Sequence, residues 1–144
     1  AVARYRSRLS GPLLDRLDLQ VEVPALTPAE LRGPEDPAGT TAALRERVLL
    51  AHARQVHRQT RSGVTVPNAR LDDQQLLRAC AADERALAAV DDVLRRHHQS
   101  ARGRVRLLRL ARSLADLDDR AEVTDLDVLQ AATLRGFAAI GAAV

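Results

Sequence analysis

Lysine, methionine and tryptophan are absent from the 144 residues, and cysteine occurs once. Without lysine the chain cannot contain a G-x-x-x-x-G-K-S/T loop, whose lysine binds nucleotide phosphates. It also lacks a hydrophobic strand ending in the paired acids that would hold magnesium beside such a loop. No apolar run approaches the roughly 20 residues that a membrane-spanning helix needs. We therefore expect that the chain by itself neither hydrolyses ATP nor binds it tightly, and that it has no membrane partner.

The single cysteine, Cys80, excludes an internal disulfide and fits a reducing compartment, so we expect a cytoplasmic location. Aromatic residues are nearly absent as well, because Tyr5 and Phe137 are the only two. The core must therefore consist of Leu, Val and Ala. Ala and Leu are strong helix formers, so the composition predicts a mainly α protein.

Charge is balanced rather than one-sided. All 22 basic residues are arginine, and 19 acidic residues leave a net charge of +3. This small net charge does not indicate a surface that is positively charged all over, as general nucleic-acid binding would favour. The distribution is more informative, because the segment from Arg95 to Arg112 holds arginines but no Asp or Glu.

Apolar and polar residues alternate from Leu17 to Val23, which predicts a half-buried strand that Pro24 ends. It is the one clear strand pattern in the chain, and a strand cannot form a sheet alone. We therefore expect an orphan strand whose partners lie in a longer protein. Residues 25–40 are rich in Pro and Gly and read as a linker, which places a domain boundary near residue 38.

The remainder, residues 39–144, predicts a bundle of about five helices. Thr40 or Thr41, Ser100 and Thr124 stand where helix N-caps are expected, and Asp127 would complete a capping box with Thr124. The predicted helices span residues 41–61, 72–81, 83–97, 100–117 and 124–135.

The helix from Ser100 to Leu117 has two faces. The face expected to pack into the core carries Leu107, Leu110, Ala111, Leu114 and Leu117. Arg102, Arg106 and Arg109 form a stripe beside it. Arg102 falls in the first turn, where the helix dipole is already positive, so this end of the helix suits an external anion. A solvated arginine face without a ligand is the alternative.

Three segments resemble one protein family. They are RYRSRLSGPLLDRLDL (residues 4–19) followed by VEVP, then SAR with Arg106 and LARSLADL (within 100–117), and finally QAA with Arg135 (within 130–135). The pattern is similar to the magnesium-chelatase-like AAA+ ATPases of bacteria, the ComM/YifB group. The resemblance implies a fragment: residues 1–38 end the AAA+ core, and residues 39–144 are its helical C-terminal lid.

The same resemblance implies two site residues. Arg16 would be the arginine finger, which reaches the γ-phosphate held by a neighbouring subunit, and Arg102 would be the sensor 2 arginine, which contacts ATP phosphate. The implied partners are the upstream AAA+ core and the neighbours in a ring, expected to be a hexamer. ATP and Mg²⁺ would belong to the full-length parent, with no cofactor for this chain alone. The parent would process DNA or drive metal insertion.

The residues also allow two other functions. The arginines between Arg95 and Arg112 could bind nucleic-acid phosphates, or the bundle could serve only as a subunit contact. Arg106, Arg109 and Arg112 fit structural ion pairs or subunit contacts. We expect no metal site, because none of the four histidines has a Cys or carboxylate at ligand spacing; they are His52, His57, His97 and His98.

Overall fold

The structure is a computed structural model that describes residues 16–21, 23–33, 36–63 and 66–137. The first part of the 4–19 motif therefore lies outside the described residues. In the described parts the elements are the 3₁₀ turns η1 (Glu30–Arg32), η2 (Pro37–Gly39) and η3 (Asn68–Arg70) and the helices α3 (Thr41–Ser62), α4 (Asp73–Cys80), α5 (Glu84–Arg96), α6 (Ala101–Leu117) and α7 (Asp125–Leu134).

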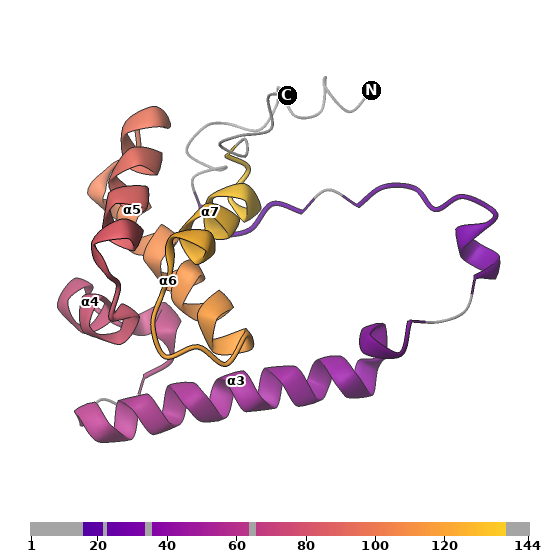
Figure 1. Cartoon of the computed structure of the whole chain (residues 1–144), viewed down its shortest axis with the longest axis horizontal. Coiled ribbons are helices and arrows are strands. Elements are labelled where there is room, and N and C mark those ends of the chain that lie inside the picture. Colours follow the sequence, from indigo (N-terminus) through magenta and orange to yellow (C-terminus); the bar gives the residue numbers. More distant parts are fainter. Residues whose placement is uncertain (1–15, 22, 34–35, 64–65, 138–144) are drawn as a thin grey trace.

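The prediction of a mainly helical bundle is confirmed. Helix α6 lies at its centre and packs against α3, α4, α5 and α7. Helix α3 runs along one side, and its N-terminal half extends past the other helices (Figure 1). The described residues 16–21 lie beside the end of α7, whereas η1 and η2 lie far from α7, on the side where α3 begins (Figure 1).

Local capping sets the helix boundaries close to where the sequence predicts them. The Thr40 side chain accepts a hydrogen bond from Ala43 N–H, and α3 ends at Gly63, whose φ of 71° suits a residue without a Cβ. Asp72 forms a capping box at the start of α4. Thr124 and Asp127 form the predicted box at the start of α7.

The strand predicted at residues 17–23 does not form in the part of it that the structure describes, residues 17–21 and 23. One backbone hydrogen bond, from Gln20 N–H to Leu134 C=O at 2.7 Å, joins this extended segment to the end of α7. Its apolar side chains are exposed; Val23, for example, is 83% exposed. A strand needs a ladder partner, and no other strand is present in the described chain to supply one.

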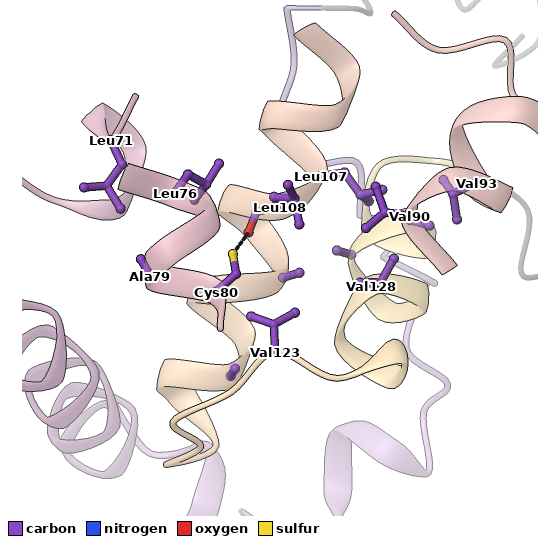
Figure 2. Close-up of a cluster of buried hydrophobic side chains, with 14 residues drawn as sticks. Leu71, Leu76, Ala79, Cys80, Val90, Val93, Leu107, Leu108, Val123 and Val128 are labelled. Carbon is purple, nitrogen blue, oxygen red and sulfur yellow. Dashed lines mark hydrogen bonds between the residues drawn. The ribbon is translucent and has the colours of Figure 1, made fainter. Parts of the chain in front are cut away.

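A core of small aliphatic side chains fills the space between α4, α5, α6 and α7 (Figure 2). Leu107 and Ala111 of α6 are fully buried, as predicted. Leu108 is fully buried as well, whereas the predicted core residues Leu110 and Leu114 are only partly buried. The thiol of Cys80 donates a weak hydrogen bond to Leu108 C=O at 3.8 Å inside this core (Figure 2).

A buried carboxylate fastens α3 to the bundle. Asp116 of α6 is fully buried and accepts hydrogen bonds from both terminal nitrogens of Arg58 at 2.7 and 2.8 Å. It also accepts from the Asn68 amide at 2.8 Å and from Arg112 at 3.0 Å. The Asp116 carbonyl accepts from Arg54 at 2.8 Å. Because Arg54 and Arg58 both lie in the C-terminal half of α3, these bonds tie down only this half of the helix.

Candidate functional site

Arg16 and Arg102, which are 86 positions apart in the sequence, lie at one pocket. The pocket has a volume of about 200 Å³ and four arginines in its wall. Its lining residues are Arg16, Gln99, Ser100, Arg102, Gly103, Arg106 and Arg135. The fold thus brings together the two arginines that the sequence singles out and adds two more.

The extended segment that carries Arg16 reaches the pocket along the end of α7. Its hydrogen bond to Leu134 C=O holds Gln20 beside Gly136. A Cβ on Gly136 would lie 2.5 Å from the Gln20 side-chain oxygen, and the φ of Gly136 is +76°. The positive φ favours glycine at this position, and a Cβ there would also require the end of the Gln20 side chain to move.

Arg16 and Arg102 are exposed, and within the described ranges neither guanidinium has a hydrogen bond or an ion pair. Asp18, a neighbour that could have neutralised Arg16, contacts Arg106 and Arg135 instead. The guanidinium forks of Arg16 and Arg102 are therefore available to a ligand. A guanidinium remains charged at any physiological pH and can bridge two oxygens of a phosphate.

Arg135 is held more firmly than the other three pocket arginines, with a side chain only 5% exposed. Its guanidinium lies over the Phe137 ring, 5.6 Å from the centroid. Phe137 in turn stacks on His97 with centroids 4.6 Å apart. The stacked rings fix where this cation stands at the pocket wall.

The start of α6 forms the pocket floor. Ser100 is the N-cap residue, as predicted, but its side chain makes no capping hydrogen bond. Gly103 is buried, and a Cβ there would lie 2.8 Å from the Gln99 side-chain oxygen, so the close approach of Gln99 favours glycine. The first-turn amides of α6 thus have no side-chain cap, which adds to the positive potential of the four arginines.

The other arginines between Arg95 and Arg112 have ion-pair or hydrogen-bond partners within the described chain, although Arg95 and Arg96 remain exposed. Arg95 and Arg96 pair with Asp92, and Arg104 pairs with Asp73. Arg109 donates to Leu71 C=O at 2.7 Å. The pairs of Arg95 and Arg96 are exposed and therefore weak, whereas Arg109 is partly buried together with its carbonyl acceptor.

Arg112 is fully buried and has a structural role. It donates to Asp116 at 3.0 Å and to the carbonyls of Ala79, Ala121 and Arg120 at 3.2, 2.6 and 2.5 Å. Burial lowers the pKa of Arg112 from its ordinary value, and the nearby Asp116 opposes that shift. Of the alternatives for Arg112, the structural ion pair is the one observed.

Two further observations concern the described residues alone. No three His, Cys, Asp or Glu side chains gather there as a metal site would require. None of the described helices combines the length and hydrophobicity needed to cross a bilayer.

Sequence reasoning did not find Arg135 or Asp18 as parts of this site. Arg135 stands next to Gly136 at the end of a helix, where an arginine usually only complements the dipole. Asp18 lies two residues after Arg16, and its distance in sequence from Arg106 hides their contact. The one available signal was indirect: Arg135 belongs to the third segment of the motif that Arg16 and Arg102 share.

Comparisons with known proteins complete the description of the site. Residues 38–135 match the family model described as magnesium chelatase, subunit ChlI C-terminal, and residues 1–31 match the model described as magnesium chelatase, subunit ChlI. Both segments that form the pocket, around Arg16 and around Arg102, thus fall within matched regions.

The chain is also similar to curated proteins. It is 33% identical over 134 residues to the uncharacterized protein YifB of Salmonella typhimurium, which covers 93% of this chain and 26% of YifB. It is 33% identical over 122 residues to the competence protein ComM of Haemophilus influenzae, covering 85% of this chain and 23% of ComM. An uncharacterized protein of Mycobacterium tuberculosis is 36% identical over 117 residues, 81% of this chain and 23% of that protein. The chain thus spans about a quarter of the length of these relatives.

Proposed function

The chain belongs to the magnesium chelatase ChlI family, and we propose that it is the C-terminal part of a bacterial AAA+ ATPase of this family that supplies two arginines for ATP hydrolysis. Arg16 acts as the arginine finger and Arg102 as the sensor 2 arginine. The observation that carries the proposal is that both guanidinium groups, without a partner in the described chain, line one pocket.

Phosphate chemistry fits this pocket. As the γ-phosphoryl group of ATP is transferred, negative charge spreads over its oxygens, and a fixed cation stabilises that charge. Guanidinium groups provide such charge together with directed hydrogen bonds. The pocket of about 200 Å³ has room for a phosphate group but not for a whole nucleotide, so the base and sugar of ATP would be held elsewhere.

Because Arg16 and Arg102 share one pocket on one chain, we propose that they contact the same nucleotide. An arginine finger acts on ATP bound by a neighbouring subunit, so Arg102 would act across the same interface. The neighbour's core would supply the phosphate-binding loop and the Mg²⁺ site, since this chain has no lysine for such a loop. Mg²⁺ would neutralise phosphate charge there, and the residues of this chain would orient the terminal phosphate from the opposite side.

The proposal is tested in the full-length protein with Arg16→Ala, Arg102→Ala and a matched control, Arg104→Ala. Arg104 lies on the same helix, two residues from Arg102, but pairs with Asp73 and does not line the pocket. Arg16→Ala should lower ATP turnover by about 10³–10⁵-fold, as loss of an arginine finger does, with nucleotide binding retained. Arg102→Ala should also lower turnover, and Arg104→Ala should not.

Mixed rings decide whether the arginines act across the interface. Rings that combine Arg16→Ala subunits with subunits lacking a working phosphate-binding loop should recover part of the activity, and so should rings built with Arg102→Ala. No recovery in assembled rings would refute action in trans. Recovery with Arg16→Ala but not with Arg102→Ala would refute the shared nucleotide.

We also propose that the ring acts on DNA. The support is the similarity to the competence protein ComM, whose branch of the family the resemblance associates with DNA. Turnover of the full-length protein should rise when branched or single-stranded DNA is added. Stimulation by a metalloporphyrin precursor with Mg²⁺, and none by DNA, would favour the metal-insertion branch of the family instead.

A further inference from the structure

The carboxylate of Asp18 forms ion pairs with two of the four pocket arginines, Arg106 and Arg135. Asp18 Oδ1 lies 3.6 Å from Arg106 Nε and 3.8 Å from Arg135 Nη1. These distances exceed the roughly 2.7–2.9 Å of a charge-assisted hydrogen bond. The Asp18 side chain is 75% exposed, whereas those of Arg106 and Arg135 are 19% and 5% exposed. The contact is thus a loose ion pair in which water screens the acid, and such pairs are weak.

Asp18 stands beside the arginine pocket rather than in its wall, since no acid lines that pocket. It lines a neighbouring pocket of about 250 Å³ together with Arg109 and Ser113. Arg106 borders both pockets. Arg106 therefore pairs with Asp18 through its Nε and also lines the pocket that Arg16 and Arg102 share.

Resting on the proposed function, we propose that Asp18 is a built-in competing anion: it neutralises Arg106 and Arg135 before ATP arrives and yields them to the terminal phosphate. A phosphate group carries about −1.5 to −2 charge and three strong acceptor oxygens, against a single charge on a carboxylate. Four cations around one pocket repel each other, and a multivalent anion relieves that repulsion better than one exposed acid. Arg106 and Arg135 are then phosphate ligands in addition to Arg16 and Arg102.

The competition has a direct consequence for affinity and selectivity. Removing the Asp18 charge should strengthen binding of any polyphosphate, because the ligand no longer displaces an internal anion. In the natural protein a weakly charged anion gains too little to displace Asp18, so the pocket favours the doubly charged end of a triphosphate.

The test is a titration of the 144-residue chain with sodium tripolyphosphate at fixed ionic strength, followed by calorimetry. Asp18→Asn removes the competing charge while keeping the size of the side chain. Asp91→Asn is the matched control, since Asp91 is an exposed acid of α5 that lines neither pocket. Asp18→Asn should bind tripolyphosphate about three- to tenfold more tightly, the range expected when a weak ion pair no longer has to be broken. Asp91→Asn should match the wild type.

Two further measurements distinguish a competing-anion role of Asp18 from a role in holding the segment on α7. In an Arg106→Ala background the gain from Asp18→Asn should shrink, because the two side chains act on each other. Amide exchange of Gln20, whose N–H donates to Leu134 C=O, should be equally fast in Asp18→Asn and in the wild type if the segment still lies on α7. Binding by Asp18→Asn that equals the wild type would overturn the competing-anion role. Binding that weakens together with loss of Gln20 protection would overturn it as well, and would show that Asp18 holds the segment on α7.

Failure of the proposed phosphate site would give a different result from failure of the competing-anion role alone. If Arg16→Ala and Arg102→Ala leave tripolyphosphate binding unchanged, the pocket is not a phosphate site, and the proposed function falls with the inference. If these two variants weaken binding while Asp18→Asn changes nothing, the phosphate site stands and only the competing anion is refuted.

Discussion

Replacing Arg112 by methionine tests the separation of structural from functional arginines on α6. Arg112 and Arg102 stand ten residues apart on the same helix and belong to the same sequence motif. Arg112 is fully buried with four acceptors, whereas Arg102 is exposed and lies at the pocket. Met is unbranched and has a similar length, so it fills most of the space that the Arg112 side chain leaves.

The magnitude follows from what Arg112→Met leaves behind. Three carbonyls, those of Ala79, Arg120 and Ala121, lose their donor, and Asp116 loses one counter-charge while keeping Arg58 and Asn68. Breaking one partner of a buried ion pair costs about 3–5 kcal/mol. For a bundle of this size each kcal/mol lowers Tm by about 4–8 °C, so Arg112→Met should lower Tm by at least roughly 12 °C.

Arg102→Met is the matched control, because it removes the same group from an exposed position of the same helix. Surface substitutions of this kind change stability by about 0.5 kcal/mol or less. Urea unfolding followed by circular dichroism measures both variants under identical conditions. A loss below about 1 kcal/mol for Arg112→Met, indistinguishable from Arg102→Met, would refute the structural role of Arg112.

Two other predictions follow from pKa shifts in the bundle. Burial raises the pKa of the Cys80 thiol to about 11, although Arg112 partly opposes it, so a thiol reagent at pH 8 should modify Cys80 only after unfolding; modification of the folded chain at the rate of a free thiol would contradict this. Burial raises the pKa of Asp127, but hydrogen bonds from Arg120 and Thr124 more than offset it and hold that pKa below its ordinary value. The ionised Asp127 therefore stabilises the fold above about pH 4, and this contribution disappears as pH falls through the depressed folded-state pKa. In urea unfolding between pH 2 and 7, Asp127→Asn should destabilise the chain at neutral pH and less so in acid; a constant difference would contradict the assignment.

Helix boundaries were predictable because local chemistry determines them. Thr40, Asp72 and Thr124 cap their helices through the backbone N–H three residues further on, so no knowledge of the fold is needed to find them. Ser100 shows the limit of such reasoning, because it occupies the N-cap position without using its hydroxyl. The pattern at 17–23 failed for the opposite reason: alternation indicates a strand only where a partner strand is available.

The candidate site was only partly predictable. Arg16 and Arg102 could be named from the motif, but their shared pocket depends on the segment around Gln20 lying on the end of α7. The sequence does carry a signal for the burial of Arg112: this residue follows Leu108 by four positions and precedes Ala115 by three, so it falls on the apolar face of α6. A charged residue on such a face, with an acid four residues later, is typical of a buried ion pair.

The attachment of α3 gives the molecule a mechanical property. Arg54 and Arg58 fix the C-terminal half of α3 to Asp116, and Ala51 is the buried apolar residue nearest to the free end of the helix. From Ala51 to Thr41 the helix projects about 15 Å at 1.5 Å per residue. The free end is joined to the segment that begins at Arg16 (Figure 1). A rotation of about 10° at the anchored half would move that end by roughly 3 Å, so α3 is a lever that amplifies small changes at the Asp116 anchor.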